Sequence, residues 1–530
     1  MRDRRPSLLP VWLLLAALAA CAPAGARSTT NTAAPAALSG AADEGWSVPS
    51  LPPLQPVAPA EYARRRAALA AQMQDGVLVV WGAPEPEADY LTFAQSPPLR
   101  YLTGIAEPGA ALVVAKTGAD VRARLFVRPR SPAREVWEGA RLGAEAAQAR
   151  TGIAARDVGT LAVVVDSLLP SGGTLYTLWA GAPDAHGGSA GVLSREAQLA
   201  GGLARRAGAR LAPLDAALLR LRALKSPAER DRIRRAAYIT ALAQRAALRA
   251  WQPGMNEFEV QGLVEYVFRR HGAERPSFAT IIGSGPNSTT LHYQANNRFS
   301  QPDEVVVMDV GASYDGYAAD VTRTVPVSGR FSPEQRAVYE IVLAAQKAAE
   351  SQARPGASWA QLQRAAARTI AEGLARLGLI DSPTATYACA EAGGVCPQYR
   401  LFFMHGLGHG IGLDVHDPDA AIGFGAPFAV GSAFTIEPGI YVRADVLEHL
   451  PDTPENRALA QRLRPAVERY RTIGVRIEDD YFITEGGVER ISAGAPREPD
   501  EVEALMRQAT PLAAERRPEV VEWYRGVAPR

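Results

Sequence analysis

The sequence predicts an α/β protein of two domains, the second of which combines helices and strands (α+β) in two matched halves. Three observations predict this fold. Apolar stretches typical of strands alternate with helical stretches between about residue 60 and Leu221. After Ser226, a helix, a Pro-Gly pair and a second helix occur twice. The length of 530 residues also exceeds one ordinary core, which favours two or three domains.

The first residues are typical of an export signal. Three arginines among the first five residues precede the apolar run Leu8–Ala20, which is too short to span a bilayer as a mature helix. The run ends at Cys21 in a Leu-Ala-Ala-Cys sequence that resembles a bacterial lipobox, in which the cysteine sulfur is acylated after cleavage. We therefore expect residues 1–21 to be a signal peptide and Cys21 to be the lipid attachment site.

The residues after the lipobox favour the outer membrane. Cys21 is followed by Ala22, not by the aspartate that often retains lipoproteins in the inner membrane. We expect an exported protein that faces the periplasm from an outer-membrane anchor. The alternative is cleavage near Ala24-Gly25-Ala26, which would release a soluble protein without Cys21. No later run is long and apolar enough to predict a transmembrane helix.

A tether and a first domain follow the leader. Residues 22–56 are rich in Ala, Pro, Ser, Thr and Gly, which predicts a disordered tether. The first domain, residues 57–224, begins with a helical stretch at Tyr62–Met73. Strands are predicted at Gly76–Trp81, Ala110–Ala115 and Arg124–Val127.

The second domain is expected at residues 225–507, followed by a C-terminal tail at 508–530. Ser226 is a good N-cap for a helix whose first turn contains Pro227. The repeated helix pairs are predicted at 229–251 with 257–271, and at 333–352 with 359–378. Each pair precedes strands that carry candidate metal ligands, so matched halves that face each other would bring those ligands together.

Five side chains of this domain can bind metal through a carboxylate oxygen or an imidazole nitrogen. They are Asp309, Asp320, His409, Glu437 and Glu478. Four carboxylates and one imidazole form a hard donor set, which favours two divalent ions, with Mn²⁺ first and Zn²⁺ or Co²⁺ as alternatives. Such a set predicts a two-metal hydrolase.

The two aspartates belong to a predicted hairpin. Asp309 lies in the apolar strand 305–311, and Asp320 lies in a second strand after a turn near 313–316. Folding back at that turn places Asp320 opposite Asp309 or one diagonal step away. Both arrangements keep the two carboxylates close enough to share ions.

The two glutamates lie in or beside strand-like stretches. Glu437 follows the stretch 433–436, at a strand end where ligands often lie. Between 475 and 480, a period of two puts Arg476, Glu478 and Asp480 on one face of a strand. Arg476 is expected to fix a metal-binding carboxylate.

The segment His405–Asp417 is the most specific in the chain. It contains His405, His409 and His416, which are three of the seven histidines. Four glycines at alternate positions predict that substrate lies against bare backbone there, with the histidines projecting into the site.

Charge and cysteine content narrow the function further. A net charge of +1 gives no reason to expect nucleic acid as a partner, which makes a peptide or another small molecule the better expectation. Cys389 and Cys396 are the only cysteines after the leader, and an oxidising compartment favours a disulfide between them over two free thiols. The pair is too small for a thiolate metal site.

Several motifs together resemble the pita-bread metallopeptidases, most closely the aminopeptidase P group, from about residue 57 to 507. They are Arg100-Tyr101-Leu102-Thr103-Gly104 with Glu107-Pro108, Leu224-Lys225-Ser226-Pro227, the stretch from Gly283 to Tyr293, and His405–Asp417. The resemblance implies a pita-bread catalytic domain with pseudo-twofold duplicated halves after a smaller creatinase-like α/β domain. It also implies cleavage of the N-terminal Xaa-Pro bond and a homo-oligomer, a dimer or tetramer.

The resemblance also implies roles for the candidate ligands. Asp309 would bind one metal, Asp320 and Glu478 would bridge both metals, and His409 and Glu437 would complete the second. A hydroxide held between the ions would attack the carbonyl before proline.

Further roles follow from the same resemblance. Glu437 would also carry the proton. His292 and His416 would stabilise the tetrahedral intermediate, and His405 would contact the proline ring.

The sequence departs from the family pattern at four places. Arg100 replaces an aromatic residue that contacts a neighbouring subunit in relatives, and Gly410 replaces a bulkier residue, which would open the pocket. Extra sequence near 387–399 and 451–470 would reshape the entrance.

Two other functions remain open. An Xaa-Pro dipeptidase shares all five ligands, although the His292 neighbourhood and the domain linker Leu224-Lys225-Ser226-Pro227 favour the aminopeptidase. A non-catalytic peptide-binding lipoprotein is disfavoured because the ligand set is complete.

Overall fold

The structure is a computed structural model. It describes residues 54–87, 91–170, 172–178, 195–391 and 394–508. The predicted signal peptide, Cys21, almost all of the tether and nearly the whole C-terminal tail lie outside these residues. None of the helices within the described ranges has the length and apolar character needed to cross a membrane.

The first domain is built on a mixed sheet with the strand order β4-β3-β2-β1-β5-β6. Its strands are β1 (Gly76–Trp81), β2 (Ala111–Thr117), β3 (Asp120–Val127), β4 (Ala154–Asp157), β5 (Thr174–Thr177) and β6 (Arg210–Pro213). Its helices are α1 (Pro59–Ala71), α2 (Pro97–Thr103), α3 (Pro132–Glu138), α4 (Gly143–Thr151), α5 (Leu161–Leu168), α6 (Arg195–Ala207) and α7 (Asp215–Arg222). The predicted helix and the three predicted strands are all present, with small shifts at their ends.

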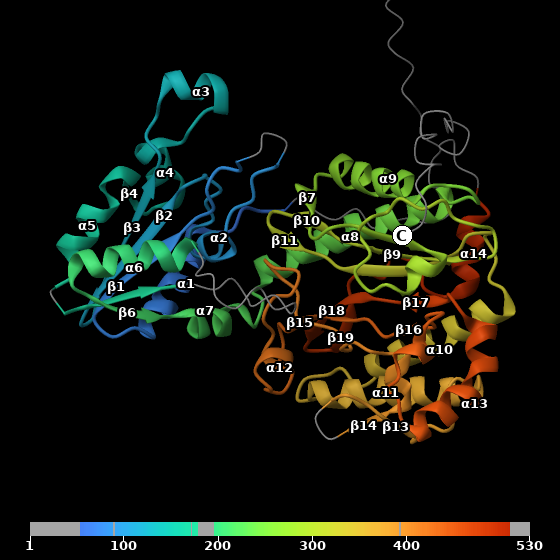
Figure 1. Cartoon of the computed structure of the whole chain (residues 1–530). Coiled ribbons are helices and arrows are strands. Elements are labelled where there is room, and N and C mark those ends of the chain that lie inside the picture. Colours follow the sequence, from blue (N-terminus) through green and yellow to red (C-terminus); the bar gives the residue numbers. More distant parts are fainter. Residues whose placement is uncertain (1–53, 88–90, 171, 179–194, 392–393, 509–530) are drawn as a thin grey trace, which may run out of the picture. The chain divides into compact units, whose positions relative to one another are not determined.

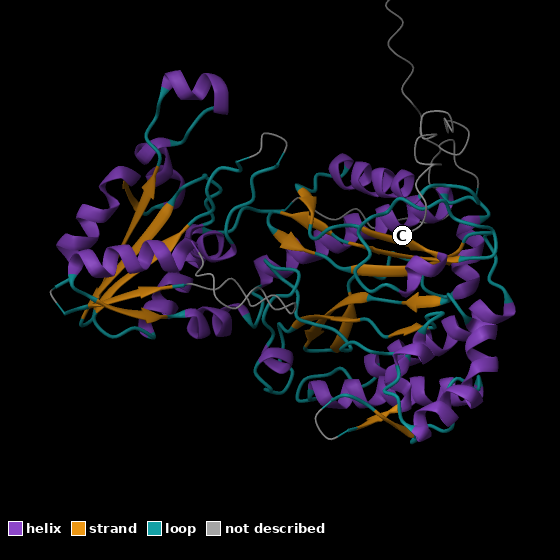
Figure 2. Ribbon diagram, in the orientation of Figure 1, coloured by secondary structure: helices purple, strands orange, loops and turns teal. Residues whose placement is uncertain are grey.

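Helices cover both faces of this sheet (Figures 1 and 2). In the central strand β1, Leu78 and Val80 pack into one apolar cluster, while Val77 and Val79 pack into another on the opposite face. A strand buried on both faces has no polar side to alternate with, which explains why β1 is apolar throughout.

The second domain begins with a helix pair and short strands. Its first half contains α8 (Pro227–Ala250), α9 (Glu257–Arg270), β7 (Arg275–Pro276), β8 (Ile281–Ser284), β9 (Val305–Val310), β10 (Ala312–Tyr314), β11 (Tyr317–Ala318) and β12 (Val321–Pro326). Ser226 caps α8 as expected, because its hydroxyl accepts the backbone N–H of Glu229 and the Glu229 carboxylate accepts the Ser226 N–H. The strands form the sheets β12-β9-β8 and β11-β10-β7.

The second half also begins with a helix pair before its strands, and it contains further helices. It contains α10 (Pro333–Glu350), α11 (Trp359–Arg376), β13 (Thr386–Ala388), β14 (Val395–Pro397), α12 (Ala420–Gly423), β15 (Ala433–Ile436), β16 (Gly439–Tyr441), α13 (Pro454–Tyr470), β17 (Gly474–Arg476), β18 (Asp479–Thr484), β19 (Gly487–Arg490) and α14 (Pro499–Met506). Helix α8 packs against β10, β11 and β12, and α10 packs against β15, β16 and β17. The four predicted helices of the duplication are therefore confirmed.

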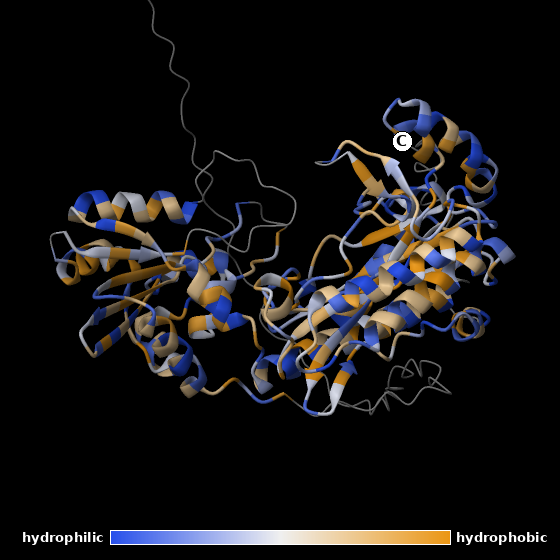
Figure 3. Cartoon of the chain, turned by 90° about the horizontal axis from the view of Figure 1, so that it is seen from below, coloured by the Kyte–Doolittle hydropathy of each residue, from blue (hydrophilic) through white to orange (hydrophobic). Residues whose placement is uncertain are grey.

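Both halves share one apolar core. It includes Leu248 of α8, Phe268 of α9, Val342 of α10 and Ile370 of α11, each fully buried. Figure 3 shows hydrophobic and hydrophilic residues alternating along the helices of this domain, as expected for helices with one face against the strands. The core fixes the strands that carry the candidate ligands.

Two local predictions have different outcomes. Cys389 and Cys396 form a disulfide, with their Cα atoms 5.8 Å apart, across the hairpin of β13 and β14. The single strand predicted from 475 to 480 is wrong. It is interrupted at Ile477 and Glu478 because β17 pairs with β16, whereas β18 pairs with β15.

Candidate metal centre and active site

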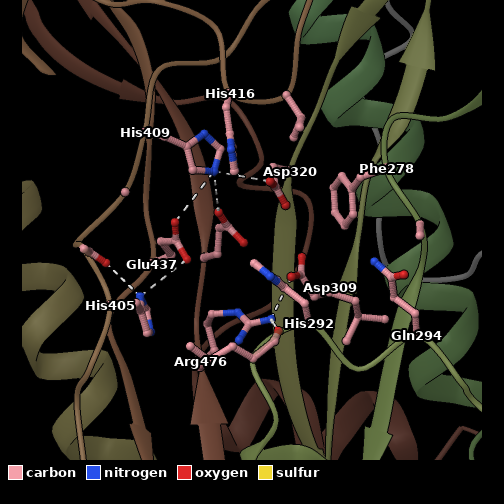
Figure 4. Close-up of a pocket in the computed structure, with 17 residues that line it drawn as sticks. Phe278, His292, Gln294, Asp309, Asp320, His405, His409, His416, Glu437 and Arg476 are labelled. Carbon is pink, nitrogen blue, oxygen red and sulfur yellow. Dashed lines mark hydrogen bonds and ion pairs between the residues drawn. The ribbon is translucent and has the colours of Figure 1, made fainter. Parts of the chain in front are cut away.

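One cavity of 610 Å³ gathers all nine candidate metal-binding and catalytic residues. They are His292, Asp309, Asp320, His405, His409, His416, Glu437, Arg476 and Glu478. The remaining wall is mostly apolar and includes Phe278, Ile281 and Leu291. Figure 4 shows the side chains converging on one cavity from both halves of the second domain; of the nine, Asp309 and Arg476 lie in strands, and the others in the segments beside them.

The positions of the two aspartates follow from a tight turn. Asp315 and Gly316 both have positive φ angles, of 48° and 79°, which is typical of a two-residue hairpin turn. This turn pairs Asp309 with Thr322, so Asp320 lies one diagonal step away. Of the two predicted arrangements, the diagonal one is correct and the directly opposite one is wrong.

The imidazole of His409 faces three carboxylates. Its Nε2 lies 3.4 Å from Oδ2 of Asp320, 3.6 Å from Oε1 of Glu437 and 3.9 Å from Oε1 of Glu478. Its other nitrogen, Nδ1, lies 3.1 Å from the carbonyl oxygen of Gly410. That hydrogen bond places the proton on Nδ1 and leaves the Nε2 lone pair directed at the carboxylates, as a metal-binding histidine requires.

The donor set fits divalent cations. Asp320, His409 and Glu478 offer ligand atoms that all lie within 4.8 Å of one another. One carboxylate oxygen each of Asp309, Asp320 and Glu478 is buried and has no hydrogen-bond partner within the part of the chain that the structure describes. Buried oxygens without donors are costly unless a cation or a proton neutralises them.

The electrostatics of the cluster support the same conclusion. Burial, followed by the neighbouring Asp309, raises the pKa of Glu478 to about 8. Burial and then the Glu478 carboxylate raise the pKa values of Asp320 and Glu437 well above their usual range. Burial, followed by the adjacent His416, lowers the pKa of His409 to about 3. Without cations, Asp320, Glu437 and Glu478 therefore favour the protonated form more than exposed carboxyl groups do, and cations would replace those protons.

Arg476 connects both ends of the cluster, as predicted from its place beside Glu478. Its guanidinium donates to Oδ2 of Asp309 at 2.7 Å and to the Thr322 hydroxyl at 3.2 Å. The Thr322 hydroxyl donates in turn to Glu478 at 2.7 Å. Arg476 also donates to the Tyr441 hydroxyl at 2.9 Å, and that hydroxyl lies 2.9 Å from Nε2 of His405.

Thr322 and Tyr441 are functional neighbours that sequence reasoning missed. Thr322 follows Asp320 by two residues, so the strand period alone would have placed it on the same face. Tyr441 lies at the end of β16, far from its partners along the chain, and no local pattern indicates it. Asp480, predicted on the same face, does not line the cavity, although its carboxylate accepts the backbone N–H of Asp320 at 3.1 Å.

The histidine segment has the expected geometry, with one correction. His292, His405 and His416 line the cavity, and the rings of His409 and His416 lie 4.2 Å apart between centroids. The prediction that alternate glycines expose backbone to substrate is confirmed for Gly406 and Gly408, which line the cavity, and is wrong for Gly410 and Gly412, which do not. At Gly406 an added Cβ would meet no atom within 4 Å.

Three glycines of the segment, Gly408 among them, make room for neighbouring protein atoms. An added Cβ would meet the backbone oxygen of Thr435 at Gly408 and the backbone oxygen of Asp417 at Gly410. At Gly412 it would meet a carboxylate oxygen of Asp417. Gly410 therefore does not open the pocket, contrary to expectation.

A two-domain α/β fold with buried carboxylates and a metal-ready imidazole in one cavity defines the class of metal-dependent hydrolases. Residues 231–485 match the model of metallopeptidase family M24, and residues 62–176 match that of the aminopeptidase P N-terminal domain. The chain belongs to family M24, in its aminopeptidase P group.

Individual relatives extend over most of the chain. Xaa-Pro aminopeptidases of Escherichia coli and Haemophilus influenzae are 34% identical, covering 84% of this chain and 97% of their own length. The human Xaa-Pro dipeptidase is 32% identical over 54% of this chain and 61% of its own length. The structure is also similar to E. coli aminopeptidase P with the inhibitor Pro-Leu, with a TM-score of 0.71, 32% identity, and coverage of 85% of this chain and 99% of that one.

Proposed function

We propose that this protein hydrolyses the first peptide bond of peptides with proline in the second position, releasing the N-terminal amino acid. The observation that carries the proposal is the single cavity in which all five metal-binding side chains meet His292, His405 and His416. Relatives that cover almost the same domains at 34% identity are named Xaa-Pro aminopeptidases. The protein is accordingly a metallo-exopeptidase.

The five donor residues would hold two divalent ions. Asp309 would serve one ion, His409 and Glu437 the other, and Asp320 and Glu478 would contribute to both. Ions bound there supply a deprotonated water near neutral pH and polarise the scissile carbonyl. The donors are mostly hard oxygens, which supports Mn²⁺ ahead of Zn²⁺ or Co²⁺.

The remaining chemistry belongs to side chains of the cavity. Glu437 accepts a proton from the attacking water and delivers it to the leaving proline nitrogen. His292 and His416 face the cavity from its two sides and stabilise the charge that develops on the carbonyl oxygen (Figure 4). Burial, followed by the nearby Arg476 guanidinium, lowers the pKa of His405 to about 3, so a neutral ring meets the proline side chain.

The test combines metal depletion with one substitution. Chelated protein should be inactive, and added Mn²⁺ should restore release of the first residue from a tetrapeptide with proline second, but not from one with alanine second. Glu437→Ala should lower kcat by about 10²- to 10⁴-fold, the usual contribution of a proton carrier. The exposed Glu485→Ala serves as the control. Full activity in chelator, or in Glu437→Ala, would refute the proposal.

Substrate length distinguishes the aminopeptidase from a dipeptidase. An aminopeptidase cleaves a tetrapeptide with proline second at least as well as the corresponding Xaa-Pro dipeptide. Preference for the dipeptide would favour the dipeptidase, whose human representative is also similar to this chain.

We further propose that the enzyme is exported and anchored through lipid at Cys21, with the catalytic domain facing the periplasm. The lipobox-like sequence supports this proposal, and it lies outside the described residues. Labelled fatty acid should enter the wild-type protein and not Cys21→Ser, and only the wild type should fractionate with outer membranes. Labelled Cys21→Ser would contradict the assignment.

A homo-oligomer is the proposed assembly. Helix α3 exposes Val136 and Trp137 almost completely, at 82% and 86%, which supports burial of this helix against a second copy. Arg100, which replaces an aromatic residue, pairs within its own chain, since its guanidinium lies 2.5 Å from Asp315. Sedimentation of the wild type beside Trp137→Ser measures the assembly.

A further inference from the structure

The loop that carries His292 has little regular structure of its own. The His292 loop, residues 284–298, begins at the last residue of β8 and is the first part of the connection to the strand β9 that carries Asp309. It supplies Leu291, His292 and Gln294 to the cavity wall. Beyond residue 289 it belongs to no helix or strand, so its position depends on side chains of other elements.

One buried carboxylate binds this loop at four residues. Glu257, the first residue of α9, is fully buried. Its Oε1 accepts the N–H and the hydroxyl of Ser284, both at 2.7 Å, and the side-chain amide of Asn287 at 3.2 Å. Its Oε2 accepts the hydroxyl of Tyr293 and the N–H of Arg298, both at 2.9 Å. The contacts therefore hold both ends of the loop and the residue next to His292.

We propose that Glu257 is a positioning residue for catalysis, because it holds the His292 loop so that His292 faces the substrate. The inference rests on the proposed function. Five donors converge on two oxygens, and among the ordinary side chains only a carboxylate combines this number of acceptors with no donor of its own. An amide of the same shape would direct an N–H₂ group at one set of donors.

The residues on both sides of His292 are fixed. The carbonyl of Leu291 accepts Nη2 of Arg476 at 3.3 Å, and Tyr293 donates to Glu257. Burial, followed by the Glu257 charge, raises the pKa of Tyr293 above its usual value, so its hydroxyl remains a donor throughout the working pH range. Two anchors that flank one residue leave its backbone little freedom to move.

A double-mutant cycle separates positioning from general stability. In the wild-type background, Glu257→Gln should lower kcat/KM for an Xaa-Pro tetrapeptide by about 10- to 100-fold, mainly through kcat, as is usual when a supporting residue behind an active-site group is lost. In the His292→Ala background the same substitution should change the residual kcat/KM less than about 2-fold, because the group it positions is gone. Metal content should stay at the wild-type value in all variants.

Two further variants make the result decisive. Tyr293→Phe removes one of the five hydrogen bonds to Glu257, together with the contacts of the same hydroxyl to Asn297, and should cost about 5-fold, again only when His292 is present. Glu259→Gln is the matched control. Glu259 lies on the same helix, and its carboxylate accepts the backbone N–H of Asn256, which the side-chain oxygen of glutamine also accepts. If Glu257→Gln does not accumulate as folded protein, the Tyr293→Phe cycle gives the same answer.

The outcomes separate this proposal from the proposed function. Equal losses in both backgrounds, or no loss in either, would overturn the role of Glu257 while the wild-type enzyme remains an Xaa-Pro aminopeptidase. A wild-type protein that cleaves no Xaa-Pro peptide with any of the three metals would overturn the function itself.

Discussion

At the scale of single residues, the glycines after His405 show how one residue type serves two purposes. Gly406 lines the cavity and has open space beside it, whereas Gly412 lies against a buried ion pair. An added Cβ at Gly412 would come within 2.2 Å of Oδ2 of Asp417 and 3.0 Å of Cε of Lys225. Lys225 Nζ lies 3.0 Å from that carboxylate oxygen, so Gly412 makes room for a buried contact between the domain linker and the residue after His416.

Gly412→Ala should therefore affect stability, whereas Gly406→Ala should affect substrate binding. Gly412→Ala should lower the free energy of unfolding by about 1–3 kcal/mol, because a tightly packed site must expand around the methyl group. Gly406→Ala should leave stability within about 0.5 kcal/mol, as is usual without a new contact. It should instead raise KM, because the methyl group enters the substrate cavity. Urea unfolding and peptide kinetics measure the two effects, and an unchanged KM in Gly406→Ala would contradict the role given to this glycine.

At the scale of elements, the duplication extends to individual hydrogen bonds. Gln244 of α8 and Gln346 of α10 each lie nine residues before the proline of the following Pro-Gly pair, and both are fully buried. Gln244 donates to the carbonyls of Met308 and Val321, which adjoin Asp309 and Asp320 in sequence. Gln346 donates to the carbonyls of Ile436 and Ile477, which precede Glu437 and Glu478. Each helix thus braces the two ligand-bearing segments of its own half.

Gln244→Met should weaken metal binding, because it removes the hydrogen bonds that hold the backbone beside Asp309 and Asp320. The substitution keeps the length of the side chain and leaves two buried carbonyls without this donor, which should cost about 1–3 kcal/mol in the free energy of unfolding. Metal affinity should fall as well, by about 10-fold or more, because Asp309 and Asp320 lose a fixed backbone. Calorimetric titration of the chelated protein with Mn²⁺ measures this effect. The exposed Gln363→Met is the control, and equal affinities in both variants would refute the bracing role.

The disulfide-linked hairpin is a separate element and should contribute to stability alone. Cys389 and Cys396 close a short loop, for which chain entropy predicts about 2.5 kcal/mol of stabilisation. Asn456 of α13 joins the hairpin through two hydrogen bonds with Ala388, at 3.2 and 2.8 Å. The double variant Cys389→Ser, Cys396→Ser should lower the unfolding free energy by up to this amount and leave kcat unchanged for a short Xaa-Pro peptide. A large loss of kcat would show that the hairpin reaches the active site.

At the scale of the whole molecule, sequence reasoning succeeded where the signal is local or periodic. The helix pairs, the buried strand β1 and eight of the nine candidate residues of the cavity follow from short patterns such as caps, apolar runs and clustered histidines. The ninth, His292, is expected only from the family resemblance. Sequence reasoning failed where distant partners decide the outcome. The break at Ile477 depends on which strands pair with β17 and β18, and the room at Gly412 depends on Lys225 in the linker. Neither partner is visible in a local window.

The charge balance of the whole cluster determines how stability should depend on pH without metal. The folded state raises the pKa of Glu478 from an ordinary 4.5 to about 8, through burial and then through Asp309. An acid whose folded pKa is raised contributes stability that is fully present below about pH 4.5 and is lost as the pH rises through about 8. Asp320 and Glu437 are shifted in the same direction, so their contributions add to this loss.

Chelated protein should therefore become less stable between about pH 5 and 8, with a slope that approaches about 1.4 kcal/mol per pH unit for each proton retained only in the folded state. Saturating Mn²⁺ should abolish this slope, because the ions replace the protons and bind the ionised carboxylates more tightly as the pH rises. Urea unfolding across this pH range with and without metal measures both curves. Glu478→Gln, which cannot ionise, should make the metal-free curve less steep. A metal-free protein whose stability rises over the same range would show that the carboxylates are already ionised without cations, and the buried acidic cluster would then need another source of compensating charge.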